Sequence, residues 1–336
     1  MKPMVITSFP DTEIRERWLA FLDEADMPTC YTSPNYFTDP YVSGKRFAVA
    51  AVDNAGEFHA VLTGVTGGTR TVSGLFSRPQ IAFRTGSDVA IAAKTLTEGM
   101  EAASPSASLI ELYSWQKIAT VGMSESPSGD ATSVVMLDLS KGSDAIFAGF
   151  SQTRRNELRK AERQNLLEIK DIETEAELAE MYEIHCDWNR LKGHEPNTFE
   201  RMRIAVGQRE NRRVLIAKAD GRVVAGSFYR FVAGGVVEYA ANFSRPEHRW
   251  LRPNDVLGWH AIQWACESGF THFSMGGSHL FLRRFGGEII TTYRYRRDKS
   301  FLKKHELRER VVSIGVGVYR RLPQGLRSRL SGLMAK

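Results

Sequence analysis

Alternating apolar and polar positions predict a set of strands joined by tight turns in the first half of the chain. Asp53-Asn-Ala-Gly56 and Gly67-Gly68 separate the first three runs, and such turn residues between alternating runs are strong hairpin signals. The predicted elements are strands over residues 46–52, 57–65 and 69–75, a helix over 88–100 and a strand over 109–115. The pattern therefore predicts an antiparallel meander followed by a helix and a further strand.

The second half of the chain repeats this order. Asp220-Gly221 and Gly234-Gly235 take the places of the two earlier turns, about 165 residues further on. The corresponding elements are strands over residues 213–219, 222–232 and 236–243, a helix over 254–268 and a strand over 271–275. A shared order of this length indicates an internal duplication.

Helical patterns precede both meanders. Residues 11–25 carry an apolar face at helical spacing, and in the second half helices are predicted over residues 151–165, with Ser151 as the N-cap, and 175–191. Residues 134–139 read as a strand that leads into the second half. We therefore predict a mixed α/β (α+β) fold with a first module over residues 1–140, a second over 141–298 and a basic helix and tail over 299–336.

Composition excludes several classes of protein. With 336 residues, 42% apolar and 25% charged, the chain is typical of a globular protein rather than a disordered or collagen-like one. Cys30, Cys186 and Cys266 are too few and too scattered for a disulfide framework or a zinc site, so we expect no metal. No run approaches the roughly 18 apolar residues of a membrane span, and the N-terminus lacks the apolar core of a signal peptide. We expect a cytoplasmic protein.

Positive charge is concentrated at the C-terminus. Residues 283–336 hold 15 Lys or Arg against 4 Asp or Glu, a surplus of 11, although the whole chain carries only +6. Such a surface attracts RNA, nucleotide-linked substrates or an anionic membrane, and it also serves as a solvated face that aids solubility. Peripheral contact with the inner face of the membrane is therefore one alternative for this segment, and DNA binding is not expected.

Two glycine pairs flank a short basic segment near the end of the second half. Gly276-Gly277-Ser278 ends an apolar strand, and Gly286-Gly287 follows Arg283-Arg284. Glycine allows close approach of a backbone to a ligand, and arginine binds anionic or carbonyl oxygens. The segment predicts a substrate contact made by Gly276, Gly277, Ser278, Arg283 and Arg284.

These features together resemble the FemABX-like branch of the GNAT acyltransferase superfamily, whose members contain two GNAT-type modules in tandem. The resemblance rests on the Arg-rich helix at 150–161, the meander and helix over 215–254 and the glycine segment at 273–287. It covers most of residues 134–297. It implies two tandem GNAT-like modules, each with a mixed, mostly antiparallel sheet flanked by helices, and an acyltransferase activity. The branch includes peptidoglycan bridge-forming aminoacyltransferases and exopolysaccharide-associated acyltransferases.

The resemblance also points to donor-binding residues, and the sequence departs from the family pattern there. GNAT enzymes hold the coenzyme A pyrophosphate on a loop with two glycines, whereas this chain has Arg249-Trp-Leu-Arg252-Pro-Asn254. We assign Arg249, Arg252 and Asn254 to the cofactor, while Asn254 also suits a helix cap. Relatives carry a lysine where this chain has Leu282, and Arg283 or Arg284 is the expected substitute.

The Arg-rich helix supplies a further substrate contact. Arg155, Arg159 and Arg163 recur at four-residue steps and so share one helix face. Bidentate binding of phosphate suits such a stripe, and a solvated face explains it almost equally well. The resemblance favours phosphates of the substrate or donor for Arg155 and Arg159, and we add Asn242 on the third meander strand as a substrate contact.

Acyl transfer to an amine needs a group that takes a proton and donors for the developing oxyanion. Glu238 is the candidate base, Tyr239 the candidate acid or orienting hydroxyl, and His185 a third candidate. Adjacent strand residues point to opposite faces, so at most one of Glu238 and Tyr239 faces the cleft. The structural alternatives are an exposed carboxylate for Glu238, core aromatic packing for Tyr239 and a packing histidine for His185.

The sequence therefore predicts direct attack by an amine, or a hydroxyl, of a cell-envelope or exopolysaccharide precursor on an acyl donor. Acyl-CoA is the favoured donor, because the chain lacks the long helical hairpin of several tRNA-using relatives. Two alternatives stay open. One is an aminoacyl-tRNA-dependent peptidoglycan bridge enzyme, and the other is a non-catalytic protein that binds RNA or an anionic membrane.

Overall fold

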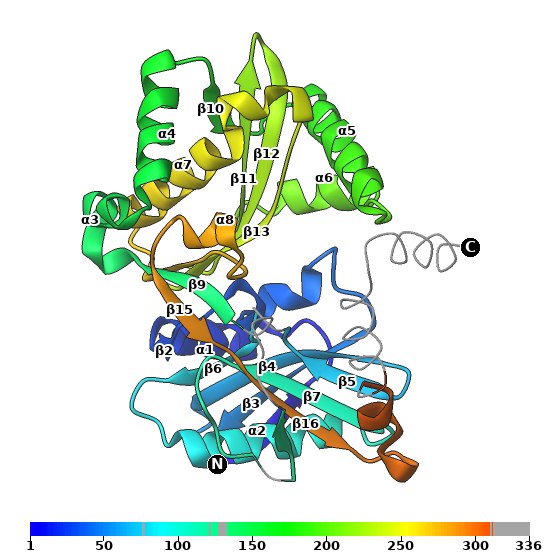
Figure 1. Cartoon of the computed structure of the whole chain (residues 1–336). Coiled ribbons are helices and arrows are strands. Elements are labelled where there is room, and N and C mark those ends of the chain that lie inside the picture. Colours follow the sequence, from blue (N-terminus) through cyan, green and yellow to red (C-terminus); the bar gives the residue numbers. More distant parts are fainter. Residues whose placement is uncertain (76–77, 121, 127–132, 310, 312–336) are drawn as a thin grey trace.

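Two packed modules make up the fold, and the chain crosses between their sheets (Figure 1). The computed structural model describes residues 1–75, 78–120, 122–126, 133–309 and 311. Its first sheet has nine strands and its second has seven. The predicted fold class, two mixed sheets flanked by helices, is confirmed.

The first sheet runs in the order β1-β3-β4-β5-β7-β16-β8, with β6 and β2 beside β4. Its strands are β1 Lys2–Ile6, β2 Ala25–Asp26, β3 Lys45–Val52, β4 Phe58–Gly67, β5 Arg70–Ser73, β6 Ile81–Arg84, β7 Leu109–Ser114, β8 Ser124–Ser126 and β16 Tyr293–Asp298. Helices α1 (Thr12–Asp23) and α2 (Val89–Ala103) cover its two faces. Asp11 and Asp88 cap these helices by accepting backbone N–H groups of the first turn.

Burial on both faces explains the continuous apolar run of β3. Phe47, Val49 and Ala51 pack with α2, whereas Ala48, Ala50 and Val52 pack with α1. Because successive strand residues point to opposite faces, a strand covered on both sides has no polar alternation. The run from Phe47 to Val52 is therefore the centre of the first module.

The second sheet runs in the order β10-β11-β12-β13-β14-β9-β15. Its strands are β9 Ser133–Asp138, β10 Glu168–Asp171, β11 Arg212–Ala219, β12 Arg222–Arg230, β13 Val236–Ser244, β14 His272–Ser274 and β15 Glu288–Thr291. The helices are α3 Gly142–Gly149, α4 Gln152–Gln164, α5 Glu175–Lys192, α6 Phe199–Gly207, α7 Pro253–Glu267 and the short α8 Leu280–Arg283. Helices α3, α4 and α7 pack on one face, and α5 and α6 pack on the other.

The duplication predicted from the turns is present in the pairing of the strands. In each module the third meander strand pairs in parallel with the strand that follows the crossover helix, β5 with β7 and β13 with β14. The helices α2 and α7 make these crossovers. A parallel pair needs such a connection, which is why each half shows a helix between its last two strands.

Each sheet contains one strand that the predicted division into residues 1–140 and 141–298 assigns to the other module. β9, which precedes residue 140, pairs with β14 and β15 of the second sheet. β16, which precedes residue 298, pairs with β7 and β8 of the first sheet. Thr292 alone separates β15 from β16 and is fully buried at the crossing. A division by sequence order misses this exchange because it places every strand with its neighbours in the chain.

The predicted basic helix over 301–319 falls largely on residues outside the described part of the chain. Within the described residues, Phe301–Lys303 form a 3-10 turn and helical residues 304–309 follow. Glu309 forms ion pairs with Arg294 and Arg296 on β16. The start of this segment is thus fastened to the first module.

The second glycine pair permits a close contact of protein backbone with protein backbone. A Cβ on Gly287 would lie 2.5 Å from the Met136 carbonyl oxygen, and its φ is +83°. Gly286 is equally close to the Gly149 carbonyl, at 2.5 Å. These glycines therefore seat β15 against β9 and α3.

We expect Gly287→Ala to lower the free energy of unfolding by about 2–4 kcal/mol, because it combines left-handed strain with overpacking. Gly221→Ala is the matched control, since Gly221 has a φ of +78° and open space around its Cβ. Its expected cost is about 1–2 kcal/mol. Urea denaturation of both variants checks this, and equal losses would contradict the role given to the β9 contact.

Candidate functional site

The parallel strands β13 and β14 part in the middle of the second sheet. They pair only over Val236–Glu238 and His272–Ser274. Beyond this point β13 contains a bulge, because Tyr239 and Ala241 face successive residues of β12 and Ala240 is left over. A bulge bends its strand and is common beside active sites. The backbone of β13 therefore turns away from β14 at Tyr239.

Two residues hold this parting in place. Gly276 has a φ of +72°, and a Cβ there would lie 2.7 Å from the Tyr239 carbonyl oxygen. Arg78 reaches across from the first module, and its Nη2 donates to the Ala240 carbonyl at 2.9 Å. The bulge is thus contacted by both modules.

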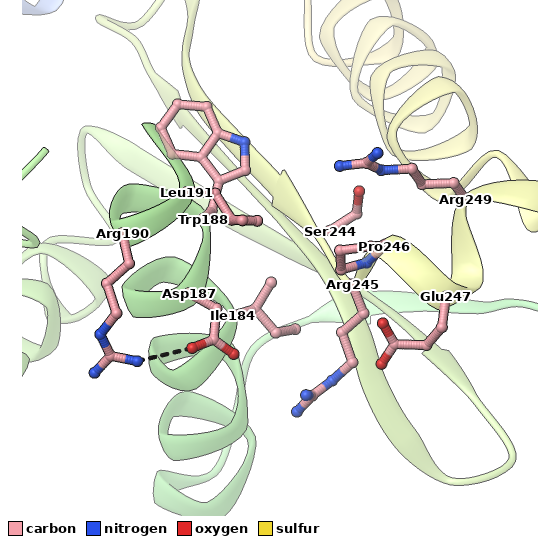
Figure 2. A pocket seen from close by; sticks show the side chains of 10 residues that line it. All are labelled: Ile184, Asp187, Trp188, Arg190, Leu191, Ser244, Arg245, Pro246, Glu247 and Arg249. Carbon is pink, nitrogen blue, oxygen red and sulfur yellow. Dashed lines mark hydrogen bonds and ion pairs between the residues drawn. The ribbon is translucent and has the colours of Figure 1, made fainter. Parts of the chain in front are cut away.

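A pocket of about 460 Å³ opens near the far end of β13 (Figure 2). One wall is the last turns of α5, with Asp187, Trp188 and Arg190. The other wall is the end of β13 and the 3-10 helix η5 (Pro246–Leu251), with Arg245 and Arg249. A capping box of Thr174 and Glu177 starts α5, and Gly193 in the left-handed conformation ends it. These caps fix where α5 begins and ends, and so fix the end of this wall of the pocket.

Three arginines and two carboxylates, Asp187 and Glu247, line the pocket. Arg190 pairs with Asp187 at 2.8 Å, and Arg245 pairs with Glu183 at 3.3 Å. Arg249 is exposed and forms no ion pair with any described residue. Its guanidinium lies on the same side of the pocket as the indole of Trp188 (Figure 2). An aromatic ring beside guanidinium groups suits a nucleotide with phosphates.

Glu238 and Tyr239 point to opposite faces of the sheet. Glu238 is buried and lies 3.6 Å from Nη2 of Arg230. Tyr239 packs in the core below α7, stacked on Tyr229 at 5.5 Å. Burial raises the pKa of Tyr239 well above its ordinary value. Glu238, unlike Tyr239, lies on the face of the sheet that carries the charged residues between the modules.

His185 is held by the protein on both sides. Its Nε2 accepts the backbone N–H of Asn197 at 3.1 Å, and its ring packs on Phe243 at 5.1 Å. Burial lowers its pKa. These contacts favour the packing interpretation, and a catalytic role for His185 stays a prediction.

The Arg-rich helix α4 contacts the protein with three of its arginines. Arg155 donates to the carbonyls of Ala148 and Phe150 at the end of α3, and Arg159 lies 5.4 Å from the Phe147 ring. Arg154, which the stripe does not include, is buried in an ion pair with Asp255 and stacks on Phe281 and Phe285. The stripe therefore fastens α4 to α3, Arg154 fastens it to α7, and phosphate binding by Arg155 and Arg159 stays a prediction.

The glycine segment after β14 is braced in a similar way. Gly277 accepts the backbone N–H of Val135, Ser278 shares a hydrogen bond of 2.6 Å with Ser133, and Arg283 donates to the Ser278 carbonyl. The backbone carbonyl of Arg284 accepts the N–H of Ser151 at the start of α4. The segment is therefore a structural hinge around the parting, beside any contact it makes with substrate.

The predicted donor loop forms η5 and the start of α7. Arg252 takes the left-handed conformation with a φ of 56° and pairs with Glu157 at 2.7 Å. The Asn254 side chain donates to Ser244 at 3.2 Å, and Asn242 is half-buried opposite Ser227. Pro253 has no N–H to offer, and the Asp255 carboxylate lies in the first turn of α7. This helix terminus does not present the free amides that a pyrophosphate needs.

Arg78, Arg230 and Arg245 lie at the bulge, beside Glu238 and in the pocket wall, and the sequence did not single them out. Glu238 interrupts an apolar run in β13, which is a signal that charge is needed there, whereas Arg230 ends β12. Arg78 carries no such signal, because its position depends on how the modules dock.

The described residues contain no helix that is long and apolar enough to cross a membrane. They also contain no group of three His, Cys, Asp or Glu arranged to hold a metal ion.

Residues 148–295 match the family model described as an acetyltransferase (GNAT) domain. This segment is a GNAT domain. It includes the bulge of β13, the parting of the strands and the pocket at η5. The match supports the prediction that the protein is an acyltransferase, and no curated protein matches the chain.

Solved structures share the two-module fold along most of the chain. FemX superposes with a TM-score of 0.63 at 13% identity, covering 88% of this chain and 97% of its own. L-PGS from Bacillus licheniformis gives 0.57 at 18%, covering 90% and 96%. A tandem GNAT protein from the clavulanic acid biosynthesis pathway gives 0.53 at 11%, covering 89% and 99%. The predicted resemblance to the FemABX-like branch is confirmed at the level of the fold.

We expect Arg154→Met to lower the free energy of unfolding by about 3–5 kcal/mol, because it leaves the Asp255 carboxylate buried without a partner. The matched control is Arg159→Met on the same helix, where an exposed cation–π contact is worth about 0.5–1 kcal/mol. Chemical denaturation of both variants measures the difference. Similar losses would show that Arg154 contributes no more than a surface residue.

His185 should make stability depend on pH. Because its folded pKa lies below the ordinary value of 6.5, its contribution is present above pH 6.5 and is lost as the pH falls further. The free energy of unfolding of wild type relative to His185→Gln should therefore decrease between pH 7 and pH 5. Denaturation curves at several pH values test this, and a constant difference would contradict the buried neutral imidazole.

Proposed function

We propose that the protein is an N-acyltransferase that moves an acyl group from acyl-CoA to an amine of a cell-envelope or exopolysaccharide precursor. A hydroxyl acceptor is the lesser variant of the same reaction, and the cytoplasm is the proposed location. The proposal rests on one observation, the parting of β13 and β14 beside an arginine-lined pocket within a GNAT domain.

The pocket suits the nucleotide end of the donor. Coenzyme A carries an adenosine with phosphates, and Trp188 and Arg249 offer a ring for the base and a guanidinium for the phosphates. The start of α7 is occupied by Pro253 and Asp255, so the phosphates depend on side chains rather than on helix amides. Arg249 is best placed for this task because no described carboxylate neutralises it.

Direct attack within a ternary complex accounts for the reaction. The acceptor nitrogen forms a bond to the acyl carbonyl carbon, and the carbon–sulfur bond of the thioester breaks. The nitrogen gives its proton to a base, and the thiolate leaves with the bonding electrons. Glu238 is our candidate for the base, since its carboxylate lies next to the bulge of β13.

An aminoacyl-tRNA is the second candidate donor. FemX and L-PGS match this chain over nearly their whole length, and the start of α7 lacks the free amides of a pyrophosphate site. The terminal adenosine of a tRNA shares its base and phosphate chemistry with coenzyme A. The same pocket therefore serves either donor, and only the carrier differs.

Donor binding tests the proposal. Arg249→Ala should weaken binding of acetyl-CoA about tenfold or more, because a charged hydrogen bond to phosphate contributes roughly 1.5–3 kcal/mol. Arg222→Ala, an exposed arginine at the start of β12, is the matched control and should change little. Calorimetric titration with acetyl-CoA and with a charged tRNA separates the two donors. If neither binds, or if both variants lose affinity equally, the proposed donor site is wrong.

A further inference from the structure

A row of charged residues crosses the second sheet beneath the first module. Arg212 on β11, Arg230 on β12 and Glu238 on β13 lie directly opposite one another in the strand pairing. All three are almost completely buried, with Glu238 only 1% exposed. Asp39 from the first module pairs with Arg212. The row therefore lies in the contact between the modules.

Four polar atoms in this contact lack a hydrogen-bond partner among the described residues. They are Nε of Arg78, Nε and Nη2 of Arg230, and Oε2 of Glu238. Arg230 stacks on the Tyr31 ring at 4.2 Å, and its 3.6 Å separation from Glu238 is too long for a hydrogen bond. Each unsatisfied buried group costs about 1–3 kcal/mol, and folded proteins contain few of them. These four atoms lie on three neighbouring residues, so one ligand can satisfy them together.

The cluster lies next to the point where β13 and β14 part. Arg78 contacts the bulge through the Ala240 carbonyl, and its neighbours include Arg230, Glu238 and Tyr31. Exposure increases along β13 at this point, because Ala240 is half-buried and Ala241 is exposed. A group that enters beside the bulge therefore meets Arg78 first.

The unpaired atoms define the chemistry of that group. Three N–H donors on Arg78 and Arg230 require an oxygen acceptor, and the Glu238 oxygen requires a donor. Asp39 already offsets Arg212, so the remaining charges are two guanidinium groups and one carboxylate. An amine next to a carboxylate matches this arrangement in hydrogen bonding, and each of its two groups meets a side chain of opposite charge.

We propose that this intermodule site binds the acceptor through an amino-acid-like end, with its amine on Glu238 and its carboxylate between Arg78 and Arg230. The inference rests on the proposed function and names its acceptor class. Arg78 then makes the first module part of the acceptor site, although the GNAT domain match covers only residues 148–295.

Half-ligands provide a test on the full-length protein. L-alanine carries both groups, propionate lacks the amine and ethylamine lacks the carboxylate. We expect NMR titration to show L-alanine binding at least tenfold more tightly than either half-ligand. Equal affinities for the three probes would overturn the proposal and would leave the cluster as a structural polar layer filled by water.

Variants assign the two halves of the ligand. Glu238→Gln should weaken L-alanine about tenfold and leave propionate unchanged, and Glu238→Asp should restore part of the loss. Arg78→Met should weaken both L-alanine and propionate. The matched control is Arg84→Met, which removes another half-buried arginine of the first module and should change neither. Loss of L-alanine binding in the control to the same extent would also overturn the proposal.

Coenzyme A binding at the Arg249 pocket reports whether each variant is folded and keeps the two proposals separate. If coenzyme A binds and L-alanine does not, the acceptor class is wrong and the acyltransferase proposal stands. If L-alanine binds and neither acetyl-CoA nor a charged tRNA does, the intermodule site stands and the donor proposal fails.

Discussion

The exchange of strands between the two sheets is the constraint on which the rest of the structure depends. β9 lies inside the second sheet and β16 inside the first, with the fully buried Thr292 at the crossing. Each sheet therefore needs backbone hydrogen bonds from a strand that the other half of the chain delivers. Because Thr292 alone joins β15 of the second sheet to β16 of the first, moving the sheets apart would pull one of these strands out of its ladder, and buried backbone groups without partners are costly. The geometry of any site between the modules is fixed by this exchange.

Fixed modules allow a first-module side chain to take part in the second module's chemistry. Arg78 contacts the bulge of β13, and the row of Arg212, Arg230 and Glu238 is closed from above by residues 30–39. Buried charges of this kind are tolerated only when partners are held precisely. A mobile interface would change the distances of Arg78 and Asp39 from the row, whereas an interlocked one keeps them constant. The interlock thus explains how a buried charged layer persists between two modules.

Local signals were sufficient to predict most elements of the fold. Asp53-Asn-Ala-Gly56 and Gly234-Gly235 mark turns by their own backbone preferences, and Asp88 and Ser151 cap their helices through contacts within one turn. Short elements with weak patterns, such as β10 and α6, were missed. The strand exchange was missed for a different reason, since the partners of β16 on β7 and β8 lie 168 to 189 residues away in the sequence. No periodicity within a segment reports which sheet the segment joins.

The same difference between local and distant contacts decides which site residues were predictable. Gly286, Gly287 and Arg155 have the composition of a ligand site, but their partners are backbone carbonyls of Gly149, Met136 and Ala148. Glycine next to arginine serves close backbone packing as well as it serves a ligand, and composition does not distinguish the two. Glu238 was more informative, because a carboxylate within a buried strand is costly unless something pairs with it. A charged residue that interrupts an apolar strand is therefore a better guide to a buried polar cluster in this chain than a glycine-rich loop.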